Sequence, residues 1–288
     1  MKTINQLKHP EASKEFDDRT VEALVRAAQP GIRRAMKILR RPEARIGIVA
    51  SPVGQLLVAE GPRGFATIHF LASSDADRPL AKLRRKFDLL ENETWRGDIN
   101  RELARYFAGD FTVLGHKVDL VMVESEFQRR ALMRLREVPI GSVITYQGLA
   151  TAVGEPDAQR AIGNTMASNP IPIFVPCHRV IRSDGTIGNY GGGVKNKITL
   201  LRNEGFALGS SLRMPSSLRM PPSAVMGHRH THIYCRPDCS AAKRADPRRS
   251  LIFADARHAR DAGLRACKLC KPGSVGKKKD AARAASLG

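Results

Sequence analysis

Four of the five cysteines stand in two close pairs near the end of the chain, Cys235-x3-Cys239 and Cys267-x2-Cys270. Cysteine pairs at this spacing are typical of a tetrahedral Zn²⁺ site. A segment of about 45 residues buries too little apolar surface to fold alone, so metal binding would supply its folding free energy. The odd number of cysteines, and an N-terminus without a secretory signal, argue against a disulfide framework. We therefore predict a zinc module over residues 228–274.

The charge balance indicates the kind of partner. The chain has 48 Lys and Arg against 28 Asp and Glu, a formal net charge of +20, and residues 228–288 alone carry 15 basic and 5 acidic side chains. A polyanion such as nucleic acid is the usual partner of such a chain, although a solvated surface with the Lys277–Lys279 tail accounts for part of the excess. No apolar run approaches the roughly 18 residues of a membrane span, so we expect a cytoplasmic, nucleoid-associated protein that binds no membrane.

Composition and periodicity divide the rest of the chain. Residues 1–44 are predicted to form a helical extension with no evident chemistry, either a solvated helix or a DNA contact. Residues 45–124 are predicted as a small α/β domain, with β-prone runs ARIGIVA, QLLVAE and FATIHFL, a helix from Asp98 to Gly109 and a strand over 118–123.

Two further segments lie towards the end of the chain. A tandem SSLRMP hexapeptide within residues 209–227 is typical of a linker, and residues 275–288 form a basic tail.

Residues 125–208 are predicted to be mainly helical. Thr145 is a candidate cap for a short helix over 146–153, Gly154 makes a turn, and a second helix follows from Pro156 to Asn169. Two short helices about a glycine turn give a helix-turn-helix pattern, which is a weak signal without further context.

The fifth cysteine, Cys177, stands apart from the others. A lone cysteine is most often a small buried hydrophobe. Here, however, it is followed directly by His178 in PCHRV, and Glu204 follows a glycine cluster farther on. Because a free thiol is only a few per cent thiolate at neutral pH, a neighbouring base is what a nucleophilic cysteine requires.

These motifs resemble the O6-alkylguanine–DNA alkyltransferases. ITYQGLA, RAIGNTMASNPIPIFVPCHRVI, GTIGNYGGG and KITLLRNEG match that family in order and spacing, and the similarity extends over about residues 45–206. The resemblance implies an α+β protein: a small ribonuclease-H-like α/β domain, then a helical acceptor domain with the helix-turn-helix, to which the zinc module is attached.

The resemblance also assigns roles at the acceptor site. Cys177 would accept the alkyl group without a cofactor, and His178 would act as base through a water, oriented by Glu204. Asn169 would hold the turn that positions the thiol. The remaining implied residues are Tyr146 beside the departing guanine and its phosphate, and Tyr190, Gly191 and Lys197 lining the pocket.

The substrate implied is double-stranded DNA with an alkylated base. The base, O6-alkylguanine or O4-methylthymine, must be flipped out of the duplex, and Arg160 would fill the vacated stack from the minor groove. A thioether product is stable, so a monomer would be consumed once per lesion. Simple packing by Tyr146 and an ordinary surface position for Arg160 stay open as alternatives.

HIYCRPDC and FADARHARDAGLRACKLCKP resemble the metal-binding domain of Ada. That resemblance implies Zn²⁺ held by the four clustered cysteines, with Cys235 as a second acceptor that repairs methylphosphotriesters. Three features differ: the module is C-terminal, the His-rich GHRHTH replaces the strand expected before Cys235, and AAKRADPRRSLIF is closer to relatives that only bind zinc and DNA. His228, His230 and His232 are alternative ligands, but four thiolates already complete the shell.

Two classes of function follow. The first is stoichiometric alkyl transfer to Cys177, with triester repair at Cys235 an open addition. The second is a non-catalytic sensor of alkylation damage or a DNA-binding regulator, although no AraC-like regulatory domain is expected.

Overall fold

The computed structural model describes residues 41–71, 76–209 and 220–272, with residues 19, 22, 23 and 25–31. Residues 1–42 and 43–288 form separate units. Of the predicted N-terminal extension, residues 25–31 are helical. Apart from residues 19, 22 and 23, the rest of the extension up to residue 40 lies outside the described residues, as do most of the hexapeptide repeat and the basic tail.

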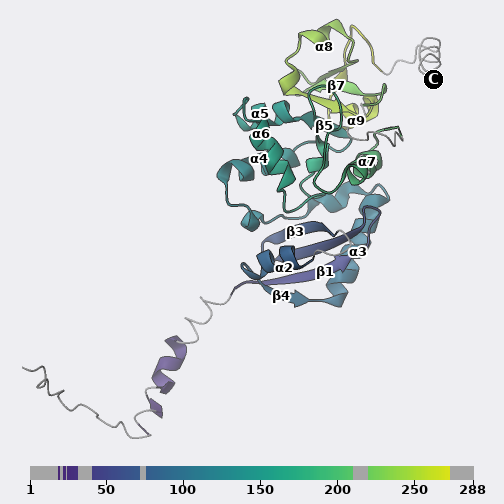
Figure 1. The fold of residues 1–288 in the computed structure, drawn as a ribbon. Helices are drawn as coiled ribbons and strands as arrows, with labels where there is room; N and C mark the ends of the chain where they lie inside the picture. Colours follow the sequence, from purple (N-terminus) through teal and green to yellow (C-terminus); the bar gives the residue numbers. More distant parts are fainter. Residues whose placement is uncertain are drawn as a thin grey trace, which may run out of the picture. The chain divides into compact units, whose positions relative to one another are not determined.

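The first sheet is built from the β-prone runs that the sequence shows. Its strand order is β3-β2-β1-β4, antiparallel except for the parallel pair β1 and β4. Figure 1 shows α2 and α3 beside these strands. The elements are β1 (Glu43–Val49), β2 (Gln55–Gly61), β3 (Gly64–Leu71), α2 (Asp77–Arg84), β4 (Asp88–Glu91) and α3 (Glu93–Phe107).

Two predictions for this region were wrong. Helix α3 begins at Glu93 rather than Asp98, because the Asn92 side chain accepts the Trp95 N–H at 2.8 Å and caps the helix earlier. Residues 118–123 form no strand beyond a single bridge at Val118. The Asp119 carboxylate instead accepts a backbone N–H two residues on, which starts the 3₁₀ helix η2 (Leu120–Met122). A second 3₁₀ helix, η1 (Phe111–Gly115), precedes it.

Helices α4 (Glu126–Arg136), α5 (Tyr146–Val153) and α6 (Gln159–Ala167) follow and contact one another. Thr145 accepts the Gly148 N–H at 2.9 Å and caps α5, and Gly154 ends it at a φ of +93°, as the sequence predicts. The second helix starts at Gln159, three residues after Pro156, because residues 155–158 form a turn. The predicted helix-turn-helix is therefore present.

The chain then continues into a second sheet of order β10-β8-β7-β9-β5-β6. Its elements are β5 (Ser142–Thr145), η3 (Cys177–Arg179), β6 (Val180–Ile181), α7 (Val194–Asn203), β7 (Val225–His228), β8 (Ile233–Cys235), α8 (Ser240–Arg244), η5 (Pro247–Arg249), β9 (Ser250–Phe253), α9 (Ala256–Asp261) and β10 (Arg265–Ala266).

The strand that the sequence indicated as missing before Cys235 is present as β7. It pairs antiparallel with β8, and it begins at Val225, inside the range predicted for the linker. Gly227 lets this strand pack closely, because a Cβ there would lie 2.4 Å from the Phe253 ring. The residues GHRHTH thus contain the end of a strand and a turn.

One hydrophobic core joins the three regions. Buried side chains of the first sheet, of α4 to α6 and of the cysteine-rich segment belong to the same cluster. Examples are Val58 and Ile68, then Leu132 and Leu149, then Tyr234 and Phe253. None of the helices in the described part of the chain combines the length and apolar character needed to cross a membrane.

Candidate active site and metal centre

The loop between α6 and η3 places Cys177. The Asn169 side chain donates to the Val175 carbonyl at 2.8 Å and accepts the Ile171 N–H at 3.0 Å, so one amide closes the loop at both ends. Ile173, wholly buried within it, has a φ of +75°, which a β-branched residue rarely adopts. Such strain persists only where surrounding packing fixes the backbone. The predicted turn at Asn169 is thus formed by hydrogen bonds that a carboxamide alone supplies.

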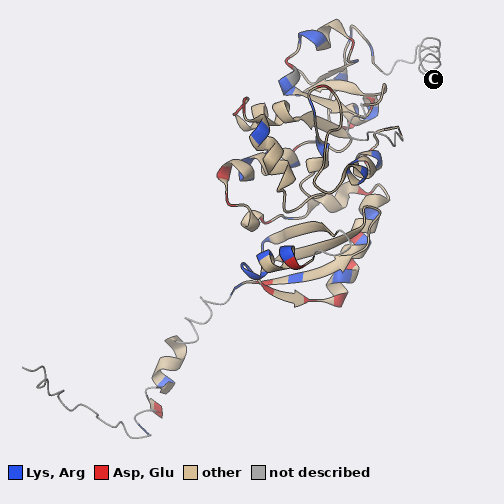
Figure 2. Ribbon diagram, in the orientation of Figure 1, with Lys and Arg blue, Asp and Glu red and all other residues tan. Residues whose placement is uncertain are grey.

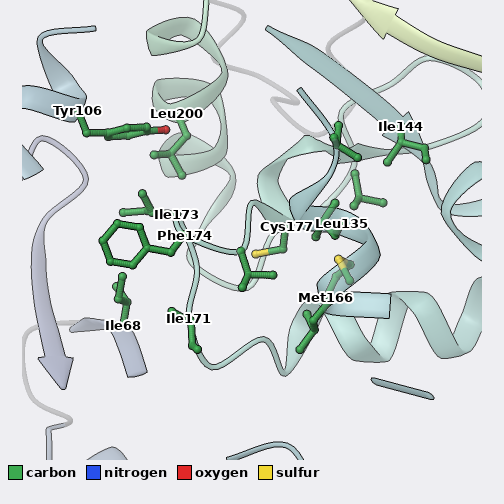
Figure 3. Packing of buried hydrophobic residues seen from close by; sticks show 14 of the residues in the cluster. Ile68, Tyr106, Leu135, Ile144, Met166, Ile171, Ile173, Phe174, Cys177 and Leu200 are labelled. Carbon is green, nitrogen blue, oxygen red and sulfur yellow. The ribbon is translucent and has the colours of Figure 1, made fainter. Parts of the chain in front are cut away.

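The Cys177 sulfur lies at the edge of the apolar core and at the wall of a small cavity. Figure 3 shows it in the cluster that also holds Leu135, Met166 and Ile171. The side chain is 5% exposed, and its Sγ lies 3.7 Å from the Tyr190 hydroxyl. The cavity, about 110 Å³, is lined by Ile68, His69, Phe70, Met166, Ala167, Asn169, Pro172, Cys177, Tyr190, Gly191 and Gly192.

A buried hydrogen-bond network stands behind the thiol. His178 Nε2 lies 2.9 Å from Glu204 Oε1, and both side chains are fully buried. Arg179 binds the same carboxylate with Nε at 2.7 Å and Nη2 at 2.8 Å, and the Tyr106 hydroxyl donates to Oε1 at 3.0 Å. The carboxylate therefore has a counter-ion and two further donors, which is what a buried charge requires.

The charges of this network are set by burial and by ion pairing. Burial opposes ionisation of Glu204, but the charge of Arg179 and the hydrogen bonds from Arg179 and His178 outweigh it and hold the pKa of the carboxyl well below its usual range. Burial lowers the pKa of His178, partly offset by the Glu204 anion. Burial also raises the pKa of the Cys177 thiol, against the lowering effect of its bonds to Asn169 and Tyr190. At neutral pH the site thus holds a carboxylate, a neutral imidazole and a thiol.

Because Nε2 of His178 is bound to Glu204, only Nδ1 of this imidazole is left to accept a proton. With the Nε2 proton directed at the anionic carboxylate, Nδ1 carries the lone pair, a tautomer assigned from the network. Among the described residues, Nδ1 is buried without a hydrogen-bond partner. A neutral base fixed by a carboxylate, beside a thiol of raised pKa, can remove the thiol proton as the sulfur attacks an electrophile.

The other predicted residues are distributed unequally. Gly191 and Tyr190 line the cavity, and burial raises the Tyr190 pKa well above its usual value. Tyr146 is half-buried at the start of α5, while Arg160 is exposed in the first turn of α6. Lys197 is completely buried and is not among the cavity residues.

Lys197 acts on the backbone around the acceptor segment. Its Nζ donates to the carbonyls of Val180 at 2.6 Å and Ile187 at 2.5 Å. Burial lowers its pKa to about 8, although the nearby Cys177 opposes the shift. Through these two hydrogen bonds, Lys197 links the segment after Cys177 to the glycine loop.

Sequence reasoning missed three residues at this site. Arg179 is the ion-pair partner of Glu204, and its position directly after Cys177 and His178 was an available signal. Tyr106 from α3 and Phe70 from β3 come from the first domain, which showed no chemistry in the sequence. Phe70 lies edge-to-face with Tyr190 at 5.9 Å between ring centroids, so the first domain forms one cavity wall.

The four clustered cysteines also converge in space. The sulfur atoms of Cys235, Cys239, Cys267 and Cys270 all lie within 4.8 Å of one another. Tetrahedral Zn²⁺ with bonds of about 2.3 Å places its sulfurs about 3.8 Å apart, so the cluster fits that ion with a small contraction.

The electrostatics of the cluster support the same assignment. Burial and the three neighbouring sulfurs raise the pKa of Cys235, whereas backbone N–H groups of Cys270 and Leu269 lower that of Cys267 to about 7. A divalent cation removes the mutual repulsion that opposes ionisation of such a group of thiols. The histidines proposed as alternative ligands do not belong to the cluster.

A second cavity opens beside the cluster. It measures about 330 Å³, and its walls include Cys235 and Cys267 together with His228, His230 and Arg249. Two of the four clustered cysteines, Cys235 and Cys267, therefore border open space.

Comparison with known proteins gives two family matches. Residues 126–206 match the DNA-binding domain of 6-O-methylguanine DNA methyltransferase, and residues 219–273 match the metal-binding domain of Ada.

Individual relatives match a little more than half of the chain. A methylated-DNA–protein-cysteine methyltransferase of Salmonella typhimurium is 36% identical over 163 residues, 56% of this chain and 95% of the relative. The bifunctional transcriptional activator and DNA repair enzyme Ada of Escherichia coli is 34% identical over 164 residues, 56% of this chain and 45% of Ada. A crystal structure of Mycobacterium tuberculosis OGT-R37K shares 30% identity with a TM-score of 0.48, covering 60% of this chain and 98% of that one.

Proposed function

Because the chain belongs to the methylated-DNA–protein-cysteine methyltransferase family, we propose that it repairs DNA by moving an alkyl group from O6 of guanine onto Cys177. The observations that carry this proposal are the placement of Cys177 at a cavity wall and, at the next residue in the chain, a buried His178 held by Glu204. A thiol that served only as packing would need neither the cavity nor the buried ion pair.

The reaction is an in-line displacement at the alkyl carbon. His178 Nδ1 takes the thiol proton through a water as the sulfur–carbon bond forms and the carbon–O6 bond breaks. The departing guanine gains the electron pair and is stabilised by a hydrogen bond for which the Tyr146 hydroxyl is the proposed donor, while the proton it finally takes up is the one released by His178 to solvent. Glu204 stays ionised and stabilises the imidazolium, as the orienting carboxylate does in other nucleophile–base pairs. The product thioether has no route back, so each molecule reacts once.

The helix-turn-helix supplies access to the base. Stacking in the duplex hides the target atom, so the guanine, or O4-methylthymine, must be flipped into the cavity. Arg160, exposed at the start of α6, is the side chain proposed to fill the gap. Phosphate contacts then supply affinity, and the lesion supplies selectivity. Location at the nucleoid in the cytoplasm and a monomeric state stay predictions of this proposal.

An intact-mass experiment tests the proposal. After incubation with an O6-methylguanine duplex, the full chain should gain one methyl group, found on the Cys177 peptide, and Cys177→Ser should gain none there. Lesion-selective binding with an unmodified Cys177 would instead indicate a sensor of damage.

The zinc module allows a second acceptor. Four thiolates would hold Zn²⁺, which makes bound sulfur nucleophilic at neutral pH, and Cys235 borders a cavity beside the cluster. We propose that Cys235 accepts methyl groups from methylphosphotriesters. Methylphosphotriester DNA, offered to a Cys177→Ser chain, should methylate the Cys235 peptide, and an unmodified Cys235 would leave the module a zinc-dependent DNA-binding element.

A further inference from the structure

The zinc module is joined to the helix-turn-helix region by a continuous sheet. Strand β9 of the module pairs antiparallel with β5, which leads directly into α5. One step beyond the pairing, the Ala254 N–H donates to the Gly141 carbonyl at 2.8 Å. Because β9 also pairs with β7, the module and the acceptor region share one set of strands rather than meeting only through a linker.

A side-chain wedge fixes the orientation of this junction. The His258 ring of α9 lies against Gly141 and Gly205, where an added Cβ would stand 2.0 Å and 2.5 Å from ring atoms. The Asp255 carboxylate holds the ring at 2.9 Å, and Arg229 donates to the Glu137 carbonyl. The His258 imidazole thus occupies the space that side chains at these two positive-φ glycines would take. This packing gives the module a defined position beside α5.

That docking carries a basic segment to the helix-turn-helix. Lys243, Arg244, Arg248 and Arg249 are all exposed, and we name these four side chains the basic ridge. Segment η5, which holds two of them, contacts α5, and the Arg248 carbonyl would lie 3.3 Å from a Cβ on Gly148.

One arginine of the ridge also interacts with an acidic residue of the turn before α6. Arg248 interacts electrostatically with Asp157, two residues before the helix that carries Arg160, and Asp246 pairs with Arg248 at 3.0 Å. In the ribbon of Figure 2, parts of α8 and α6 are coloured as basic residues. The single acidic residue within 240–249 leaves the ridge with an excess of positive charge.

We propose that the basic ridge and helices α5 and α6 bind the phosphates of one duplex, so that the zinc module lengthens the DNA contact on one side of the lesion. This inference rests on the proposed repair of DNA. It makes the module part of lesion binding whether or not Cys235 accepts methyl groups. The ligand is the phosphate backbone, because exposed Arg and Lys side chains without a base-reading helix neutralise phosphates without reading sequence.

Salt dependence of duplex binding tests the proposal in the full, zinc-loaded chain. Each phosphate contact contributes about 0.9 to the slope of log K against log salt concentration. We expect Arg248→Gln/Arg249→Gln, and separately Lys243→Gln/Arg244→Gln, to reduce the slope by about 2 each. The matched control Arg78→Gln/Lys82→Gln removes two exposed charges from α2 and should leave the slope unchanged. Equal slopes in all three variants would overturn the proposal.

A duplex-length series in the unmodified chain gives an independent test. Shortening the duplex on one side of the lesion should lower affinity and slope, while shortening the other side by the same length should not. In Arg248→Gln/Arg249→Gln that asymmetry should shrink, since the lost flank and the lost side chains share one contact. A symmetric length dependence would overturn the proposal even if a variant failed to fold.

Alkyl transfer separates this inference from the repair function. Methylation of Cys177 by free O6-alkylguanine base does not involve phosphates and should proceed equally in all these chains. If alkyl transfer is normal but the salt slopes of the variants do not differ, only the basic-ridge proposal is rejected. If the unmodified chain shows no alkyl transfer, the repair proposal is rejected.

Discussion

Glu204 is the residue on which the acceptor site depends most. It is fully buried, yet its carboxyl stays ionised, because Arg179 and His178 bind it from two sides and Tyr106 donates to it. A buried ion pair adds little net stability, but removing one partner leaves an uncompensated charge. Arg179 therefore links the stability of the fold to the protonation state of the base.

Replacing Arg179 with leucine should destabilise the chain by about 3–5 kcal/mol, because Glu204 would lose its counter-ion and the Val138 carbonyl a donor. Urea denaturation measures the change. Arg101→Leu, which removes an exposed partner of Asp98, should cost at most about 1 kcal/mol. A value below about 1 kcal/mol for Arg179→Leu would show that the buried carboxyl takes up a proton at little cost.

The pH profile of alkyl transfer reports on His178. Only the neutral imidazole accepts the thiol proton, so the rate should rise with pH through the His178 pKa, which burial places below the ordinary value of 6.5, and then level off. Glu204→Gln removes the anion that raises this pKa, so the acid limb should move to lower pH while the plateau rate falls. The measurement is single-turnover transfer from the free base between pH 5 and 8.

Tyr106→Phe serves as the control for that profile. It removes one hydrogen bond to Glu204 and leaves the carboxylate charge in place. Its acid limb should stay where the unmodified chain has it. An identical profile for Glu204→Gln would mean that another group removes the thiol proton.

Strand β5 and the glycine beside it hold together two regions that are far apart in sequence. Gly141 has a φ of +66°, accepts the Ala254 N–H and faces the His258 ring. The interface therefore needs both an unusual backbone angle and the absence of a side chain. Neither requirement is visible from the sequence around it.

A pair of glycine variants separates these two requirements. Gly154→Ala, at φ +93° with open space around it, should cost about 1 kcal/mol from backbone strain alone. Gly141→Ala adds a collision with His258 and should cost clearly more, about 3 kcal/mol or above. Denaturation midpoints of both chains test this, and equal losses would mean that the His258 contact is easily displaced.

The three regions share one core, so loss of the metal should affect more than the module that binds it. The cluster of buried side chains runs from the first sheet through α4 to α6 into β8 and β9. Cooperative unfolding of such a chain extends beyond any one segment. The zinc site is accordingly part of the stability of the whole described fold from residue 43 onwards.

Chelation of the metal should lower the Tm of the full chain by about 5 °C or more, which corresponds to a few kcal/mol for a protein of this size. The fluorescence of Trp95, the single tryptophan, reports on unfolding of the first domain. After chelation, the unfolding transition that it records should shift to the same lower Tm. A Cys239→Ser/Cys270→Ser chain should show no further response to chelator. An unchanged Trp95 transition would show that the module unfolds by itself.

The sequence by itself was enough to predict the candidate acceptor site and the zinc module of this protein. The PCHRV segment, the carboxylate after the glycine loop and the two cysteine pairs carry residue types and spacings that only a few reactions require. Short-range signals also placed α5 and its ends, because Thr145 and Gly154 act on their own neighbours. Sequence reasoning nevertheless overlooked the local caps at Asn92 and Asp119, and it missed β7, which forms by pairing with β8 and β9.

Only the tertiary structure decided which surfaces meet. Tyr106 and Phe70 reach the acceptor site from a domain without visible chemistry, and β9 joins β5 across more than a hundred residues of sequence. Contacts of this kind depend on long-range packing, in which a side chain is selected by the shape and charge left by remote segments. Local patterns carry no record of that complementarity, and so the shared sheet and the placement of the basic ridge beside α5 emerge only once the chain is folded.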